Sequence, residues 1–425
     1  MITINYPDKS TWKEILKRPA LDSTSLETTV KSILADIKSN GDSAVKKYAL
    51  QFDKANLNAF EVNQNEIKSA ETKLSTELKN AIQNAKNNIE KFHSAQKEET
   101  QQIETTSGVN CWRKSVGIEK VGLYIPGGSA PLFSTVLMLG VPAKLAGCKE
   151  IILCTPSDSN GNINPAILFA AQLVGVTKIF KVGGVQAIAA MAYGTESIPQ
   201  VYKIFGPGNQ YVTCAKQLIN KEGVAIDMPA GPSEVAVIAD ETCVPAFVAA
   251  DLLSQAEHGA DSQVILVSNS ENVIKKVNEE LELQLKALSR NTIAEKALQN
   301  SKAILVNSLE EGLELLNEYA SEHLIIACSN ADELAGIVVN AGSVFIGNYS
   351  CESAGDYASG TNHTLPTNGY AKAYSGVSLD SFVKKITFQK LSKEGINTIG
   401  KTIELMAEAE GLDAHKNAVS IRLKY

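Results

Sequence analysis

The sequence predicts an α/β protein in which two parallel-sheet units follow a helical N-terminal region and precede a helical C-terminal extension. Two observations carry this prediction. Short β-branched runs alternate with helical stretches from Lys120 onward, and the same alternation starts again after Ser233. Such alternation is typical of parallel sheets with helical crossovers. The expected architecture is therefore two Rossmann-like units in one chain.

Helices are expected before the first sheet, across residues 26–97. Apolar residues recur there three to four positions apart, as at Val30, Ile33 and Ile37. His93 falls in a polar part of this region, so it is expected on a solvated helix face.

The first α/β unit is predicted from Lys120 onward. Its strands are expected at Val121–Ile125, Glu150–Cys154, Lys178–Val182 and Lys203–Phe205. Its helices are expected at Ser134–Ala146, Asn164–Val174 and Val185–Tyr193. Two prolines and a glycine within Met228–Ser233 then indicate a junction between the units.

The second unit repeats the pattern. Its strands are expected at Glu234–Ala239, Gln263–Val267, Ala303–Val306, Leu324–Cys328 and Val344–Ile346. Its helices are expected at Pro245–Glu257, Asn272–Leu288, Leu309–Tyr319 and Asp332–Asn340. A polar stretch from Gly347 to Gly376 carries His and Asp without clear periodicity, as functional loops often do. A helix near Ile396–Ala409 is expected to close the chain.

Composition favours a soluble cytoplasmic protein with a small-molecule partner. A net charge of -7 over 425 residues argues against a nucleic-acid or anionic-membrane surface. The seven cysteines form no C-x-x-C pair, so neither a disulfide framework nor a thiolate zinc site is indicated. The N-terminus lacks a signal-peptide pattern, and the apolar runs are too short to span a bilayer.

Four of the five histidines lie beside other ligand or acid/base groups, which points to a metal-assisted site. Gln255 and His258 are three apart at the end of a predicted helix, so both can project from one face. Alone, such a pair is usually a cap or surface pair. With Asp356 and His415 it gives an amide oxygen, a carboxylate and two imidazoles, a set that suits zinc.

Glu322 and His323 are adjacent, and at a helix-to-strand junction both can line one cavity. A surface loop pair is the simpler interpretation. The functional one is a histidine base with a glutamate that activates water, as consecutive oxidations of an alcohol and a hydrated aldehyde require.

Three glycine-rich turns follow predicted strands, namely Tyr124–Ser129, Gly183–Gln186 and Phe205–Asn209. None is a G-x-G-x-x-G fingerprint, and such turns occur in most α/β proteins for conformational reasons. Three of them at the carboxyl ends of one sheet nevertheless form a plausible nucleotide crevice.

Long strings of distinctive residues resemble the histidinol dehydrogenase family. They are Ile226–Val235, Asp251–His258, Ser321–Leu324, Glu352–His363 and Glu410–Ala418. The resemblance extends over essentially the whole chain. A minor departure is Cys351, where the family pattern leads us to expect proline.

The resemblance implies a homodimer that uses one zinc ion per subunit and NAD to oxidise L-histidinol to L-histidine through the aldehyde, the last step of histidine biosynthesis. It implies zinc ligands at Gln255, His258, Asp356 and His415, which would also hold substrate. It implies substrate contacts at Ser233, His323, His363 and Glu410, and NAD contacts at Tyr124, Gln186 and Asn209. Glu410 and His415 would serve the neighbouring subunit's site.

Four segments are expected on this basis: a helical region 1–118 that packs with the second unit, an NAD-binding unit 119–232, a catalytic and metal unit 233–376, and a dimer-crossing extension 377–425. His323 would be the base in both oxidations, and Glu322 would activate water in the second. Two alternatives stay open. One is a related dehydrogenase of another small polyol, and the other is a zinc hydrolase with Glu322 as base.

Overall fold

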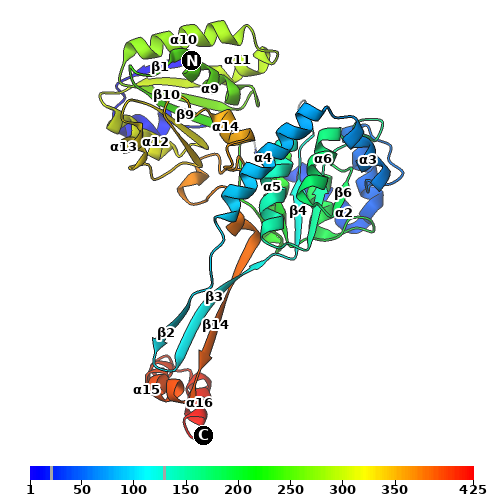
Figure 1. The fold of residues 1–425 in the computed structure, drawn as a ribbon, viewed down its shortest axis with the longest axis vertical. Helices are drawn as coiled ribbons and strands as arrows, with labels where there is room; N and C mark the ends of the chain where they lie inside the picture. Colours follow the sequence, from blue (N-terminus) through cyan, green and yellow to red (C-terminus); the bar gives the residue numbers. More distant parts are fainter. Residues whose placement is uncertain (20–22, 128–130) are drawn as a thin grey trace.

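A computed structural model describes residues 1–19, 23–127 and 131–425 and confirms the two parallel α/β units. Figure 1 shows these units side by side, with a long arm projecting away from both. In the described part of the chain, no helix is long and apolar enough to cross a membrane.

The first unit is a five-stranded parallel sheet in the order β6-β5-β4-β7-β8. Its strands are β4 (Lys120–Tyr124), β5 (Glu150–Cys154), β6 (Lys178–Phe180), β7 (Lys203–Phe205) and β8 (Ala225–Ile226). Its helices are α5 (Phe133–Leu145), α6 (Pro165–Val174), α7 (Gly184–Tyr193) and α8 (Gln210–Lys221). Residues 134–143 of α5 are all buried, because this helix lies between the sheet and other helices. The predicted strands and helices are confirmed, and β8 and α8 are additions.

The second unit is a six-stranded parallel sheet in the order β1-β11-β10-β9-β12-β13. Its strands are β1 (Ile2–Asn5), β9 (Glu234–Ala239), β10 (Gln263–Ser268), β11 (Lys302–Leu305), β12 (His323–Ala327) and β13 (Ser343–Ile346). Its helices are α9 (Pro245–Ala256), α10 (Glu271–Leu285), α11 (Asn291–Gln299), α12 (Leu309–Tyr319), α13 (Ala331–Ala335) and α14 (Glu352–Tyr357). Helix α13 is shorter than predicted, because it ends at Gly336. The edge strand β1 and the helices α11 and α14 were not predicted.

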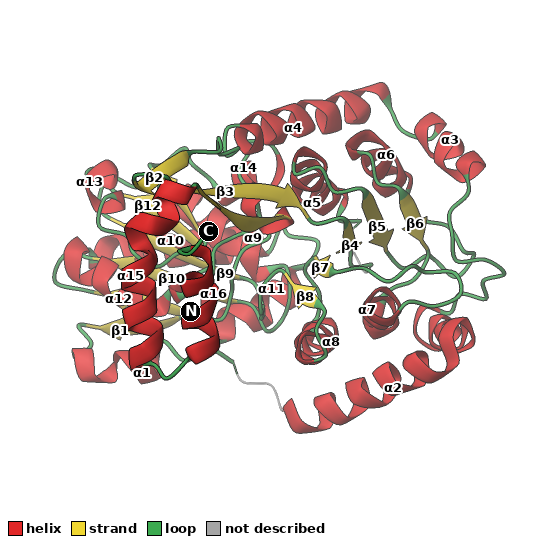
Figure 2. Cartoon of the chain, turned by 90° about the horizontal axis from the view of Figure 1, so that it is seen from below, coloured by secondary structure: helices red, strands yellow, loops and turns green. Residues whose placement is uncertain are grey.

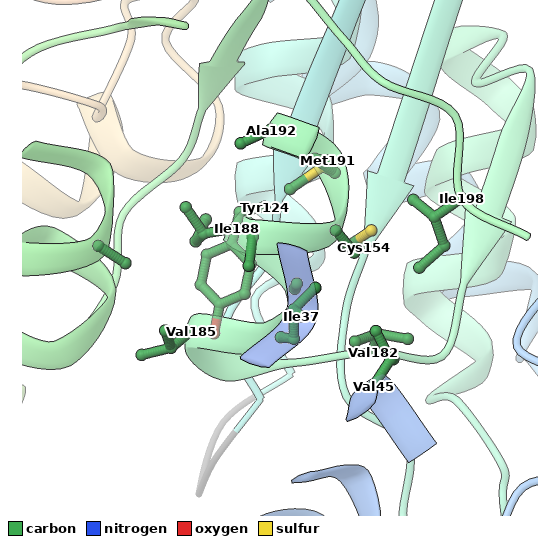
Figure 3. Packing of buried hydrophobic residues seen from close by; sticks show 14 of the residues in the cluster. Ile37, Val45, Tyr124, Cys154, Val182, Val185, Ile188, Met191, Ala192 and Ile198 are labelled. Carbon is green, nitrogen blue, oxygen red and sulfur yellow. The ribbon is translucent and has the colours of Figure 1, made fainter. Parts of the chain in front are cut away.

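The N-terminal region is divided between the two units, so the expectation that it packs with the second unit is wrong for most of its length. Only β1 and α1 (Trp12–Ile15) belong to the second unit. Helix α2 (Ser23–Tyr48) packs on α7 and α8, α3 (Gln64–Thr72) on α6, and α4 (Thr76–Ser94) on α5. The physical reason is the apolar face of α2, since Ile37 and Val45 complete the core formed by Val182 and Ile188 (Figure 3).

His93 contradicts its predicted solvated position. Its side chain is fully buried in the last turn of α4. Nδ1 lies 2.9 Å from the carbonyl oxygen of Ile89, and Nε2 lies 3.5 Å from Nδ2 of Asn362. The polar surroundings of His93 in the sequence gave no sign that a distant loop covers this face of the helix.

The arm is an antiparallel sheet in the order β14-β3-β2, followed by two helices. Its elements are β2 (Gln102–Thr106), β3 (Val109–Gly117), β14 (Val383–Leu391), α15 (Lys393–Ala409) and α16 (Asp413–Arg422). The C-terminal extension is therefore not wholly helical, and the helix near Ile396–Ala409 does not close the chain. Helices α15 and α16 lie together in both views, and Figure 1 shows them at the far end of the arm (Figures 1 and 2).

Candidate active site

A cleft of about 1030 Å³ is lined by both units. Pro126 and Asn209 contribute from the carboxyl edge of the first sheet, where β4 and β7 end. Ser233 and His258 contribute from the second unit, and Arg18 from the N-terminal segment. Of the predicted site residues, Asn209 thus faces Ser233 and His258 across one cavity.

The Glu322–His323 pair lies at the amino end of β12, as the predicted helix-to-strand junction requires. The backbone N–H of Glu234 donates to Oε2 of Glu322 at 2.9 Å. Nδ1 of His323 lies 3.2 Å from the carbonyl oxygen of Glu234 and 3.7 Å from Oε2 of Glu322. Both side chains are buried, so the interpretation as an exposed loop pair is wrong.

Gln255 and Asp356 flank His323. Nε2 of Gln255, in the last turn of α9, lies 3.3 Å from Nδ1 of His323. Nε2 of His323 lies 3.4 Å from Oδ1 of Asp356, which α14 supplies. His258 lies just beyond α9, exposed at the rim of the cleft and within electrostatic range of Asp356.

His363 connects the two units. Its Nδ1 lies 2.9 Å from the carbonyl oxygen of Asp356, and its Nε2 lies 3.0 Å from Oγ1 of Thr135 in α5. Both ring nitrogens are therefore engaged in this structure. A substrate can bond to Nε2 of His363 only if the hydrogen bond between Thr135 and His363 is broken.

Four buried polar atoms at this site have no hydrogen-bond partner within the described part of the chain. They are Oε1 of Gln255, Nε2 of His323, Oε2 of Glu352 and Oδ1 of Asp356. Buried polar atoms are rarely left unpaired, so this concentration indicates a site built to receive a polar ligand or a cation. In the same described residues, no group of three or more His, Cys, Asp or Glu side chains could hold a metal ion. The amide oxygen of Gln255 is a further possible metal ligand that does not belong to these four residue types.

Burial and charge change the acidity of this site strongly. Burial raises the pKa of Glu322 to about 8 and that of Glu352 to about 8. Burial acts to lower the pKa of His323, but the negative charges of Glu322 and Asp356 outweigh it and raise that pKa to about 10. Burial acts to raise the pKa of Asp356, but the nearby imidazole of His323 outweighs burial and lowers it. Such a cluster of perturbed groups is typical of an active site.

Glu410 and His415 are not brought to this site within one chain. Glu410 ends α15 and His415 lies in the first turn of α16, both exposed at the tip of the arm. Figure 1 shows this tip far from the two α/β units. Any role for these residues at the cleft therefore requires a second subunit.

The predicted NAD residues lie at the carboxyl edge of the first sheet. The ring of Tyr124 is embedded in the core, and its hydroxyl accepts the N–H of Gly184 at 3.1 Å (Figure 3). Gln186 is buried in the first turn of α7, with its Nε2 3.3 Å from Oδ2 of Asp53. Asn209 caps α8 by accepting two backbone N–H groups. In the predicted turn Tyr124–Ser129, positions 128 and 129 lie outside the described residues.

Strands β4 and β7 are neighbours whose following helices lead to opposite sides of the sheet. That is the switch point at which open α/β sheets bind nucleotides. The crevice hypothesis from the three glycine turns therefore has topological support.

Sequence reasoning missed several residues of this site. Glu352 lies one helical turn before Asp356, and this four-residue spacing could have been noticed. Glu234 follows Ser233 directly, but its partner Arg18 is 216 positions away. Asp53 lies beside Gln186 but is 133 positions away in sequence. Only the folded chain pairs these groups.

The fold and cleft define a two-unit nucleotide-dependent α/β enzyme. The histidinol dehydrogenase family matches residues 16–423. A histidinol dehydrogenase of Bacteroides fragilis (strain ATCC 25285) is 64% identical over 100% of this chain and 99% of its own length. That of Escherichia coli (strain K12) is 52% identical over 97% of this chain and 94% of its own.

A crystal structure of histidinol dehydrogenase from Elizabethkingia anophelis superposes with a TM-score of 0.98. It is 59% identical and covers 100% of this chain and 98% of that one. The chain belongs to the histidinol dehydrogenase family, whose members are NAD-dependent oxidoreductases. The hydrolase and the polyol dehydrogenase are accordingly not favoured.

Proposed function

We propose that this protein oxidises L-histidinol to L-histidine through L-histidinaldehyde in the cytoplasm, with NAD as the hydride acceptor. The observation that carries the proposal is the buried Glu322–His323 pair. It is bonded to Glu234, the neighbour of Ser233, which lines a cleft shared with the carboxyl edge of the first sheet. Residues 119–232 would form the NAD-binding unit, with contacts from Tyr124, Gln186 and Asn209. Residues 233–376 would form the catalytic unit.

In the first oxidation, Nε2 of His323 takes the hydroxyl proton of histidinol while hydride leaves the same carbon for NAD, which gives the aldehyde. Nε2 suits this role because it has no hydrogen-bond partner in the described residues, although it lies near Asp356. Ser233 and His363, together with Glu410 of the partner subunit, would hold the substrate.

In the second oxidation, Glu322 takes a proton from water as the oxygen adds to the aldehyde carbon, and the protonated His323 returns its proton to the carbonyl oxygen, which gives the hydrate. His323 then takes a hydroxyl proton of the hydrate while hydride leaves for a second NAD. The product is the carboxylic acid, which loses a proton to give the carboxylate. The pKa of Glu322, raised to about 8, places this carboxyl in the range of a general base near neutral pH.

Zinc fits the residues that remain unpaired. Gln255, His258 and Asp356 would hold it with His415 of the partner subunit, since Oε1 of Gln255 and Oδ1 of Asp356 are buried without partners within the described chain. When bound, zinc would anchor the imidazole and amine of histidinol and offset the negative charge that raises the pKa of His323. Chelation should therefore abolish turnover, and added zinc should restore it.

The arm supports a homodimer. Ile103 and Phe388 on its sheet, and Leu405 and Met406 at its tip, are exposed apolar side chains. Exposed apolar surface of this kind marks an interface. A second copy of the chain is the partner that would also bring Glu410 and His415 to the cleft.

Counting NADH formed per histidinol consumed tests the reaction. We expect two NADH for each histidine, because the oxidation removes four electrons. One NADH with free aldehyde would contradict the second oxidation. Product without NADH would indicate a hydrolase, and faster turnover of another small alcohol would indicate a different dehydrogenase.

A further inference from the structure

We propose that Glu234, held by Arg18, is a positioning residue that orients both Glu322 and His323. The inference rests on the proposed function, because it concerns the same two oxidations. Glu234 begins β9, the strand paired with β12, and it follows the proposed substrate residue Ser233.

The two peptide groups of Glu234 contact the two catalytic side chains. Its N–H donates to Oε2 of Glu322 at 2.9 Å, which fixes one carboxylate oxygen. Its carbonyl oxygen lies 3.2 Å from Nδ1 of His323. A carbonyl can only accept, so this hydrogen bond keeps a proton on Nδ1 and leaves Nε2 for the substrate hydroxyl. Nε2 of Gln255 also lies 3.3 Å from Nδ1, and it competes with this arrangement unless a bound ligand orients the amide.

The side chain of Glu234 is anchored on both oxygens. Oε1 accepts Nε of Arg18 and, at 2.9 Å, the backbone N–H of Asn368. Oε2 accepts Nη2 of Arg18 at 2.9 Å. This two-pronged contact is the geometry in which arginine fixes a carboxylate most firmly.

Arg18 is itself held on a third element. Its Nη2 donates to the carbonyl oxygen of Tyr319 at 2.8 Å, and its guanidinium lies 4.0 Å from the centre of the Tyr319 ring. Tyr319 ends α12, three residues before Glu322. Arg18 thus joins the residues that precede the catalytic pair to the strand that faces it.

The location of this ion pair favours positioning over stability. The Glu234 side chain is only 2% exposed, and buried ion pairs add little net stability compared with apolar packing. Asp240, directly after the other end of β9, offers a comparison. Its carboxylate accepts hydrogen bonds from Thr242 and Ser329, neither of which belongs to the proposed site.

The test compares Glu234→Gln with Asp240→Asn in the full-length, zinc-loaded protein. Each oxidation is assayed alone, with histidinol or with histidinaldehyde, together with the KM for NAD and the Tm. Glu234→Gln should lower kcat of both oxidations by about 10- to 100-fold, the effect of misplacing catalytic groups by about 1 Å. Its KM for NAD should stay within about twofold. Asp240→Asn should lower Tm but leave both kcat values unchanged.

A folded Glu234→Gln protein with kcat within about twofold of wild type would overturn the positioning role. So would an equal loss in Asp240→Asn, because that would make the effect one of general stability. If Glu234→Gln does not fold, Arg18→Lys decides: it keeps the charge but loses the two-pronged contact. It should lower both kcat values, and unchanged values would refute the inference. Failure of the wild-type protein to oxidise histidinol would instead refute the proposed function.

Discussion

The two α/β units share a parallel sheet with helical crossovers, but they present opposite edges of that sheet to the cleft. The first unit presents its carboxyl edge, where Tyr124 ends β4 and Pro207 follows β7. The second presents its amino edge, where Ser233 precedes β9 and His323 begins β12. Asp240 marks the carboxyl edge of the second sheet, with hydrogen bonds from Ser329 and Thr242.

The rule that parallel α/β sheets bind ligands at their carboxyl edge therefore applies to the first unit and not to the second. Nucleotides bind at carboxyl edges because helix N-termini and glycine turns gather there. No comparable rule places an acid/base pair at an amino edge. There the useful feature is the set of backbone groups just before each strand, such as the N–H and carbonyl of Glu234. A substitution at the amino edge should therefore impair catalysis, and one at the carboxyl edge should impair NAD binding.

The largest expected effect is at the amino edge. His323→Ala should lower kcat for both oxidations by about 10²- to 10⁴-fold, because it removes the proposed base. The Kd for NAD should be unchanged, since the crevice of the first unit is intact. Steady-state kinetics and NAD titration check both values. A similar loss of NAD affinity would contradict the division of labour between the two edges.

A second effect concerns the proposed contribution of the partner subunit to the site at the amino edge. His323→Ala and His415→Ala chains should each be inactive alone. In a heterodimer, one site collects both lesions and the other collects none. Random mixing gives about half heterodimers with one intact site of two, so activity should recover to roughly a quarter of wild type. Co-expression with two affinity tags and a turnover assay of the mixture measure this recovery. After tandem purification, the heterodimer alone should reach about half of the wild-type activity.

A purified heterodimer as inactive as its parents would contradict the shared site. The matched control pairs His323→Ala with Glu322→Gln chains, which both alter the cleft of their own subunit. In that mixture every site keeps one lesion, so aldehyde oxidation should not recover.

The carboxyl edge should show a smaller effect, confined to the cofactor. The buried ion pair of Lys216 and Asp227 holds the backbone of Gly206. Nζ of Lys216 donates to the carbonyl oxygen of Gly206 at 2.8 Å, and the N–H of Gly206 donates to Oδ2 of Asp227 at 2.8 Å. Gly206 has φ of +129°, and an added Cβ would lie 2.0 Å from the carbonyl oxygen of Tyr124. Asp227→Asn should loosen this turn and raise the KM for NAD about tenfold, equivalent to about 1.4 kcal/mol.

In the same Asp227→Asn protein, the ratio of the two oxidation rates should not change, because the catalytic pair lies on the other unit. Measuring both half-reactions at saturating NAD checks this. A changed ratio would mean that the two edges are coupled through the Met228–Ser233 junction.

The sequence predicts these two units well because their strands are short, apolar and regularly spaced. The nine strands expected from residue 121 to 346 are all present, and so is the buried Glu322–His323 pair. The arm was missed because β14 and β3 pair across a long stretch of chain and are largely exposed, so neither has a buried-strand pattern. Burial of His93 and the Arg18–Glu234 pair likewise depend on segments remote in sequence.

The smallest expected effect distinguishes a cofactor contact from a stability contact at the carboxyl edge. Asp53 lies beside Gln186, and burial raises its pKa to about 6. A carboxyl whose pKa is higher in the folded protein binds more protons there than in the unfolded chain between about pH 4 and 6. Its contribution is therefore lost as pH rises through about 6.

Asp53→Asn removes this ionisation while keeping an acceptor for Gln186. The variant should match the wild-type Tm near pH 4 and exceed it by a few degrees near pH 8, where the wild-type carboxylate is charged in a partly buried place. Thermal unfolding followed by circular dichroism across this pH range measures the difference. If the variant were instead less stable at pH 8, the ionised Asp53 would be stabilising, and Gln186 would depend on its charge. The KM for NAD, measured in parallel, should change less than in Asp227→Asn, because Asp53 bonds to the side chain of Gln186 whereas Asp227 holds the backbone of the turn.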